Sequence, residues 1–202
     1  MPEPTPPAPD RLVVRLAQPQ DVEPLVALAA ETFPDACPPG LGPEAIAEHV
    51  ARELDAAHFA SWVAGRYGEP ATPAVVLVAE AADRLAGYAL LVRARPAEPA
   101  QLDALLGPEY PHAAAVELSK VYALASARGT GATGTLMVAA LEAAAELLDG
   151  HAVWLGTNAQ NVRAQTFYRK HGFTEVGRRR YVVGGEPQDD VVMARAVGAR
   201  QA

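Results

Sequence analysis

Apolar residues recur along the chain with two periods, one typical of helices and one typical of strands. A short apolar run over residues 11–16 predicts a first strand. Asp21 precedes apolar residues at helical spacing, which predicts a helix that Asp21 caps and that Phe33 and Pro34 end. The same spacing over residues 44–59 predicts a second helix, so the chain begins with one strand and two helices.

Between residues 74 and 92 the pattern changes to that of strands. Residues 74–79 form a continuous apolar run rich in β-branched side chains, as expected of a strand covered on both faces. Residues 85–92 form the next strand, and the short turn between the two predicts a hairpin. Residues 96–111 then form a loop that is long for a compact domain and is therefore a candidate functional loop.

Residues 116–124 alternate between two faces, which predicts another strand. One predicted face carries Val116, Leu118, Lys120 and Tyr122, and the other carries Glu117, Ser119 and Val121. The predicted elements that follow are a helix to about residue 148, a strand over 153–155, a helix over 161–171, and a hairpin of 173–183 with 190–195 around Gly184 and Gly185. The predicted order is β-α-α-β-β-β-α-β-α-β-β.

Composition and charge narrow the function classes. With 202 residues, half of them apolar, the chain is long enough for one α/β domain with a real core. A formal net charge of −7 argues against a protein that coats nucleic acid or an anionic membrane. No apolar run approaches the roughly 20 residues of a membrane span, and residues 1–10 lack the features of a secretory signal. We expect a cytoplasmic protein with a disordered leader at residues 1–10.

Cysteine and histidine usage predicts no metal site. Cys37 is the only cysteine, which excludes an intramolecular disulfide and a cysteine zinc site. The five histidines show no ligand spacing such as HExxH. Cys37 lies in a predicted loop rich in proline and glycine, and we interpret it as a free thiol without function.

The loop between the strand at 116–124 and the next helix carries the strongest chemical signal. It reads Arg128, Gly129, Thr130, Gly131, Ala132, Thr133, Gly134. Its glycines allow successive backbone N–H groups to face one concavity at a helix start, where an anion is favoured, and Arg128 adds a charged donor. A glycine-rich turn without a ligand fits the loop equally well. The P-loop interpretation lacks its Gly-Lys-Ser/Thr ending.

A second signal lies further along the chain, in the helix predicted over residues 161–171. Asn161 and Tyr168 are seven residues apart, two helical turns, and so lie on one face. Simpler roles are also open, with Asn161 as a helix cap and Tyr168 as a packed core residue.

Together the two segments resemble the GNAT superfamily (Gcn5-related N-acetyltransferases). Residues 117–131, ELSKVYALASARGTG, are similar to its fourth strand and acyl-CoA loop, whose pattern is Q/R-x-x-G-x-G/A. Residues 161–173, NVRAQTFYRKHGF, are similar to its second hallmark, N-x-x-A-x-x-F-Y-x-x-x-G-F. The resemblance implies a single α/β (α+β) domain over residues 11–197. Its mixed sheet of six to seven strands would splay between the fourth and fifth strands, with about four flanking helices.

The resemblance also implies roles for particular residues. The donor acetyl-CoA would be bound by Tyr122, Ala123, Leu124, Arg128, Gly129, Thr130, Gly131, Ala132, Thr133, Gly134 and Asn161. Tyr168 would act as the general acid for the departing thiolate. Glu117, on the strand that lines the site, is the candidate base, directly or through water, and a structural or solvent-facing carboxylate is the open alternative.

The sequence departs from the family pattern at Thr133, which occupies a position that is normally Gly or Ala. Its side chain would either crowd the phosphate or donate its hydroxyl to it. Acceptor contacts are expected from residues 33–44, Trp62 and the loop at 96–111, which are regions that vary in the family. Arg178, Arg179 and Arg180 are expected at a solvated strand edge, with a contact to the 3′-phosphate of CoA as the sharper alternative.

The resemblance predicts an N-acetyltransferase that moves an acetyl group from acetyl-CoA to a primary amine of a small molecule or peptide. A looser likeness to bacterial polyamine acetyltransferases of the Pai type adds a polyamine-like acceptor to this class. Two alternatives stay open: a catalytically silent GNAT-fold module that binds acyl-CoA as a regulator, and a nucleotide-binding protein. Dimers are common in the family, and no sequence feature locates an interface.

Overall fold

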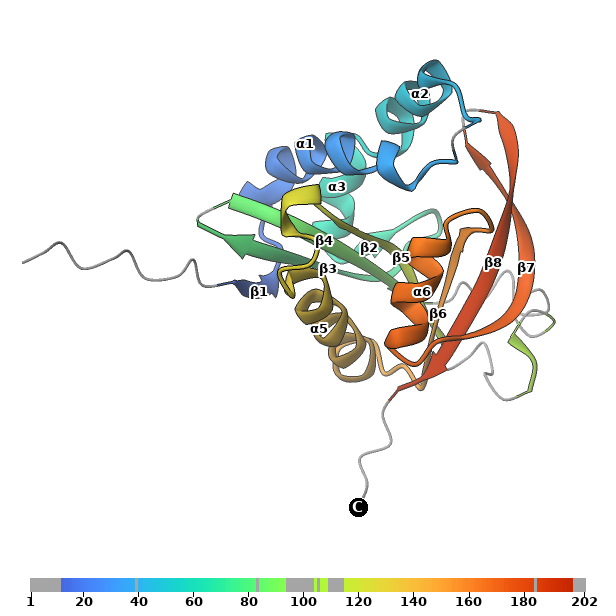
Figure 1. Cartoon of the computed structure of the whole chain (residues 1–202). Helices are drawn as coiled ribbons and strands as arrows, with labels where there is room; N and C mark the ends of the chain where they lie inside the picture. Colours follow the sequence, from blue (N-terminus) through green and yellow to red (C-terminus); the bar gives the residue numbers. More distant parts are fainter. Residues whose placement is uncertain are drawn as a thin grey trace, which may run out of the picture.

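An open mixed sheet runs through the molecule in the strand order β1-β3-β4-β5-β6-β8-β7, and β2 pairs with β3 beside this path (Figure 1). The strands are β1 (Val13–Leu16), β2 (Arg66–Tyr67), β3 (Thr72–Ala81), β4 (Arg84–Arg93), β5 (Ala115–Ala123), β6 (Ala152–Asn158), β7 (Thr174–Val183) and β8 (Glu186–Ala196). This computed structural model describes residues 12–38, 40–82, 84–93, 104, 106–108, 115–183 and 185–197. The expected leader at residues 1–10, most of the loop at 96–111, and Gly184 lie outside that part.

Helices cover both faces of the sheet (Figure 1). They are α1 (Val22–Thr32), α2 (Pro43–Glu53), α3 (Ala56–Val63), α5 (Ala132–Glu146) and α6 (Val162–Lys170). Each face has its own apolar core. One core joins α1 and α3 to β3 and β4 around Leu25, Phe59 and Tyr88, and the other joins α5 and α6 to the sheet around Leu136, Met137 and Phe173. No helix in the described ranges is both long and apolar enough to cross a membrane.

The helix predicted over residues 44–59 is wrong in one respect, because the structure has two helices there. Leu54 leaves the helical conformation with φ −125°. Asp55 then starts α3 as its N-cap, since its Oδ1 accepts a hydrogen bond from the His58 N–H at 2.8 Å. A carboxylate at this position satisfies an N–H group that a continuous helix would bond internally. The periodicity of apolar residues was uninterrupted, so it did not reveal the break.

The other predicted elements are present, and β3, β4, β6 and β8 are longer than predicted. The hairpin of β3 and β4 is confirmed, as is the final hairpin of β7 and β8. The two-residue β2 was not predicted. Among the described residues it brings the sheet to eight strands, one more than the upper expectation, and the helix break gives five α-helices there where about four were expected.

The predicted splay is confirmed. The fourth and fifth predicted strands are β5 and β6, because the unpredicted β2 shifts the numbering by one. These strands pair in parallel through residues 115–117 and 152–154 alone. Beyond that point β6 continues along β8, which it pairs through seven residues, and β5 continues along β4. The sheet therefore opens into two halves after three residue pairs, and this opening leaves room for a ligand between them.

The alternation predicted for residues 116–124 is wrong after Leu118. The pairing of β4 with β5 shifts register there, because Leu90 is opposite Lys120 and Leu91 is opposite Leu118. Ser119 is thus an extra residue, a β-bulge, and a bulge reverses which face the following side chains take. Val121, not Lys120, follows Val116 and Leu118 into the α5 core. Lys120 and Tyr122 lie on the same face as Glu117 instead.

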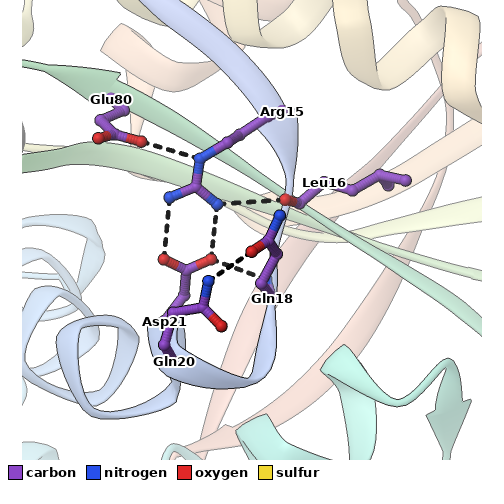
Figure 2. A network of polar contacts seen from close by, with 6 residues as sticks. All are labelled: Arg15, Leu16, Gln18, Gln20, Asp21 and Glu80. Atoms are coloured by element: carbon purple, nitrogen blue, oxygen red, sulfur yellow. Dashed lines mark hydrogen bonds and ion pairs between the residues drawn. The ribbon is translucent and has the colours of Figure 1, made fainter.

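A polar network fixes the first strand to the first helix. Figure 2 shows Arg15 of β1 between Glu80 of β3 and Asp21, which precedes α1. The Arg15 guanidinium donates to both carboxylate oxygens of Asp21 at 2.7 and 3.0 Å and to Glu80 at 2.8 Å. Asp21 is buried and also accepts from the Gln18 N–H at 2.7 Å. Asp21 therefore occupies the N-cap position of α1, but the predicted side-chain cap is wrong, because its carboxylate binds Arg15 and the preceding turn and accepts no hydrogen bond from the first turn of α1.

Candidate active site

A cavity of about 690 Å³ occupies the opening between the two halves of the sheet. Its walls come from β5, from the glycine loop of residues 128–134, from α6 and from the hairpin of β7 and β8. The chain before α2 also contributes, with Phe33, Asp35 and Cys37. These segments are far apart in the sequence, so the fold assembles one site from most of the predicted pieces.

The glycine loop has a shape suited to an anion. Gly129 and Gly131 both have left-handed backbone conformations, with φ +81° and +93°, which side chains other than glycine rarely adopt. The second of these glycines is the N-cap of α5 and has no side chain to cap the helix. The Thr130 hydroxyl accepts from the Ala132 N–H at 3.4 Å, and no described side chain bonds the next two N–H groups, those of Thr133 and Gly134. Uncapped N–H groups at the positive end of a helix dipole favour a negatively charged ligand.

The loop residues divide into those that face the cavity and those that do not. Arg128, Gly129, Gly131, Thr133 and Gly134 line it, whereas Thr130 and Ala132 do not. The Thr130 hydroxyl donates to the Ala127 carbonyl at 2.8 Å, and Ala132 is buried in a small cluster with Ala86 and Ala127.

Two of the lining residues, Arg128 and Thr133, differ in how their polar groups are used. Arg128 forms an ion pair with Asp35 at 2.5 Å and donates to the Ala123 carbonyl at 3.2 Å. Its guanidinium therefore joins the chain before α2 to the end of β5 at the edge of the cavity. The Thr133 Oγ1 is buried and has no hydrogen-bond partner among the described residues. A hydroxyl without a partner beside a helix start can donate to a bound anion.

The predicted main-chain segment of β5 lies partly in the cavity. Tyr122 and Ala123 line it and Leu124 does not. The Leu124 N–H donates to the Ala86 carbonyl at 2.9 Å. The Leu124 side chain packs against the core beside α1 and α3 and against the small cluster that contains Ala132. The part of β5 that has separated from β6 is therefore the part that faces the cavity.

Asn161 and Tyr168 lie at opposite ends of α6 and both line the cavity. Asn161 caps the helix, since its Oδ1 accepts from the Ala164 N–H at 3.0 Å. Tyr168 packs between the rings of Phe167 and Phe173 and is 9 % exposed. Burial raises the pKa of Tyr168 well above its usual value. The phenol is thus protonated at neutral pH and can donate a proton into the cavity.

Glu117 belongs to a charged cluster, which we define as Glu117, Lys120, Arg179 and Asp190. All four line the cavity. Arg179 of β7 is 3.6 Å from the Glu117 carboxylate and 3.4 Å from that of Asp190. Asp190 is buried, and this burial raises its pKa although Arg179 opposes the shift.

Arg179 is held from several sides. Its guanidinium lies 5.4 Å from the Trp154 ring centre and 5.4 Å from that of Tyr181. It also crosses Gly156, where a Cβ atom would lie 2.4 to 2.6 Å from the guanidinium atoms. The missing side chain at Gly156 therefore makes the space that Arg179 fills. The expected solvated edge is confirmed for Arg178 and Arg180 and is wrong for Arg179, because alternate residues of a strand face opposite sides.

Lys120 is a member of the charged cluster that sequence reasoning placed on the wrong face. Its ammonium lies 5.0 Å from the Trp62 ring centre. Among the described residues Lys120 makes no hydrogen bond or ion pair, and burial lowers its pKa. Only the bulge at Ser119 turns it toward the cavity, and the sequence carried no separate signal for that bulge.

His49 of α2 is a second lining residue that the sequence did not indicate. It is 4 % exposed and stacks on Phe33 with the ring centres 4.7 Å apart. Burial, with Lys120 and Arg52 as smaller causes, lowers the pKa of His49 below its usual value, so the ring is neutral at pH 7. Its Nδ1 has no partner in the described part of the chain. His49 thus adds an uncharged polar group to the cavity wall.

The expected acceptor contacts have mixed outcomes. Part of the segment at residues 33–44 lines the cavity. Trp62 is buried behind the wall and contacts it through Lys120. Cys37 is a free thiol whose pKa burial raises to about 11, which leaves it protonated and weakly reactive. The described residues hold no group of three or more side chains suited to a metal ion.

Comparisons with known proteins place this arrangement in a family. A family model described as the acetyltransferase (GNAT) family matches residues 33–173. An uncharacterized N-acetyltransferase of Mycobacterium tuberculosis is 38 % identical over 175 residues, which cover 87 % of this chain and 97 % of the relative.

Solved structures of low identity share the fold. The PaiA N-acetyltransferase of Thermoplasma acidophilum, solved in complex with coenzyme A, has a TM-score of 0.69 at 17 % identity and covers 92 % of this chain and 99 % of that one. A structure from Salmonella typhimurium, solved with its cofactor acetyl-CoA, has a TM-score of 0.66 at 18 % identity and covers 95 % and 97 %. The family model, the mycobacterial relative and the splayed sheet agree, and the chain belongs to the GNAT family of acetyltransferases.

Proposed function

We propose that this protein transfers an acetyl group from acetyl-CoA to a primary amine of a small molecule or peptide by direct attack. One observation carries the proposal: the uncapped start of α5, the protonated Tyr168 and the Glu117 carboxylate all line one cavity. Direct transfer needs a donor site, a proton donor and a proton acceptor that reach the same substrate pair.

The donor's pyrophosphate would lie at the glycine loop, on the N–H groups at the start of α5, with Thr133 as an additional hydroxyl donor. The pantetheine arm would run along the open edge of β5 at Tyr122 and Ala123. Asn161, whose Oδ1 is already engaged as a cap, retains its amide N–H groups for the arm. The residues present therefore fit acetyl-CoA at each of these points.

The chemistry assigns one proton transfer to each of two side chains. A primary amine has a pKa of about 10.4 and must lose a proton before it attacks the thioester carbonyl. We assign that proton to Glu117, directly or through water. As the new C–N bond forms and the C–S bond breaks, Tyr168 gives its proton to the departing thiolate.

Glu117→Gln is expected to lower kcat about 100-fold in steady-state kinetics, because the variant cannot accept the amine proton. An unchanged rate would assign that proton to another group.

Two measurements separate this proposal from its alternatives. Isothermal titration with acetyl-CoA, CoA and ATP identifies the donor, and binding of ATP without CoA would exclude the acetyltransferase. A panel of polyamines, aminoglycosides, amino acids and peptides is then assayed for thiol release. Binding of CoA with no release above background would support a silent acyl-CoA-binding regulator, for which the unusual Thr133 is the observation in favour.

A further inference from the structure

The Lys120 ammonium is a cation in the cavity wall without a matching anion. No hydrogen bond or ion pair joins it to any residue that the structure describes. Its one close partner is the face of Trp62, at 5.0 Å. Lys120 is half-buried, and a cation–π contact compensates a charge less completely than an ion pair with a carboxylate does. The charge of Lys120 is therefore incompletely compensated.

The nearby carboxylates of the charged cluster form ion pairs with Arg179 and not with Lys120. Arg179 contacts the carboxylates of both Glu117 and Asp190, so those three groups form a subset with a net charge of about −1. Burial and, to a smaller extent, Arg179 lower the pKa of Lys120, and Glu117 and Glu53 oppose this shift only through longer-range attraction. An anion bound beside Lys120 would therefore favour its charged form. His49, which also faces this region, is neutral at pH 7. The charged cluster thus presents one negative and one positive position side by side.

We propose that the acceptor is a small amine that also carries a carboxylate, of the α-amino acid type, and that Lys120 binds this carboxylate. The inference rests on the acetyl transfer proposed above and names its substrate class. The amino group of such an acceptor would face Glu117, and its carboxylate would complete the ion pair that Lys120 lacks. A zwitterion carries a charge opposite to that of each position: its ammonium faces the negative position and its carboxylate faces the positive one.

The position of Lys120 agrees with this class of acceptor. It lies on β5 two residues before Tyr122, along which the thioester arm would run, and the Ser119 bulge places it on the same face as Glu117. Two residues of a strand span roughly 7 Å, so a group bound by Lys120 lies close to the reacting carbonyl. An α-amino acid has its carboxylate two bonds from its nitrogen and fits that short separation. A polyamine would instead bring a second cation toward Lys120.

Acceptor specificity is tested with matched pairs. Each of the common L-amino acids is assayed beside its own carboxamide, with spermidine as the polyamine, and thiol release from acetyl-CoA is measured. Wild-type protein is expected to favour at least one free acid over its amide by tenfold or more in kcat/KM. Lys120→Met should bring that ratio close to one, and Lys170→Met, at an exposed position, should leave it unchanged. Equal or better use of amides or spermidine by wild-type protein would overturn the proposal.

A binding measurement tests the same contact without turnover. Lys120 and Lys170 are the only lysines of the chain, so trace acetylation with deuterated acetic anhydride, read by mass spectrometry, reports Lys120 against an internal reference. The preferred amino acid is expected to slow labelling of Lys120 at least threefold and to leave Lys170 unchanged, whereas its amide should protect neither. Absence of protection by every amino acid would overturn the carboxylate contact. If acetyl-CoA fails to bind while protection is observed, the acetyl transfer fails and the carboxylate site stands.

Discussion

At the scale of single residues, the protonation state of Tyr168 decides what it can do. A tyrosine of ordinary pKa is already protonated across the physiological range, and burial between Phe167 and Phe173 raises the pKa of Tyr168 further, so the phenol holds its proton there and is not a phenolate. The sequence placed Tyr168 correctly, since an Asn cap seven residues earlier sets the face of α6. It did not reveal the packing that shifts the pKa, because Phe173 approaches Tyr168 only after the turn that follows the helix.

Tyr168→Phe removes the proton donor and keeps the ring that packs in the core. We expect kcat to fall about 100-fold, within the range known for general acids, and the Kd for acetyl-CoA to stay within twofold. Steady-state kinetics and titration calorimetry measure the two quantities. Tyr88→Phe is the matched control, since the Tyr88 hydroxyl is buried without a partner away from the cavity. An unchanged rate in Tyr168→Phe would remove Tyr168 as the acid.

Thr133 is the residue at which this chain leaves the family pattern, and its buried Oγ1 has no partner in the described structure. Thr133→Val removes the hydroxyl and keeps the shape. The free protein should become slightly more stable, because an unsatisfied buried group is lost, by about 1 kcal/mol. Binding of CoA should weaken about tenfold if the hydroxyl donates to a phosphate. Thermal unfolding measures the stability and calorimetry measures the binding. CoA affinity equal to wild type would show that the Thr133 hydroxyl makes no stabilising hydrogen bond to the phosphate.

At the scale of elements, the sequence predicted nearly every helix and strand, and it failed where one residue changes a local pattern. Ser119 is a bulge that turns Lys120 toward the cavity, and Asp55 divides one predicted helix into α2 and α3. Both effects depend on hydrogen bonds between neighbours. Periodicity averages over such single positions, so it located the elements and misassigned the face of Lys120.

The network that joins β1, α1 and β3 sets an element-scale prediction. Arg15 lowers the pKa of Asp21 below its ordinary value, so the carboxylate stabilises the fold above about pH 4. That contribution disappears as the pH falls through the folded-state pKa. Asp21→Asn should therefore reduce the free energy of unfolding by about 2 kcal/mol at pH 7, as expected for the loss of hydrogen bonds between charged groups in a part-buried pair. Urea unfolding at pH 7, 5 and 3 measures it. The deficit should shrink at pH 3, and a deficit independent of pH would contradict the role of charge.

At the scale of the whole molecule, the opening of the sheet brings residues from both of its halves into one proposed site. The glycine loop follows β5, and Arg179 and Asp190 come from β7 and β8 beyond the splay. The two motifs and their order sufficed to predict the family and the splay, and the proposed donor site rests on the same motifs. The proposed acceptor side was not predictable, because it depends on contacts across the opening, such as Gly156 of β6 against Arg179, that no local spacing encodes.

Gly156→Ala tests the proposed role of Arg179 in acceptor binding. The added Cβ would occupy the place of the Arg179 guanidinium, which is the far end of a flexible side chain and would have to move aside. Its displacement would release Glu117 and Asp190 and disturb the acceptor position. We expect KM for the acceptor amine to rise at least tenfold, while the Kd for acetyl-CoA stays within twofold.

Gly150→Ala is the contrasting variant, because its Cβ would lie 2.6 Å from Val116 Cγ2 and 2.8 Å from the Ala144 carbonyl in the packed core. That change should lower the melting temperature without raising KM selectively, since backbone and core atoms must shift. Steady-state kinetics with both substrates varied, beside thermal unfolding of both variants, distinguishes the two effects. If Gly156→Ala weakened acetyl-CoA and acceptor binding equally, Arg179 would support the cavity as a whole and not the acceptor alone.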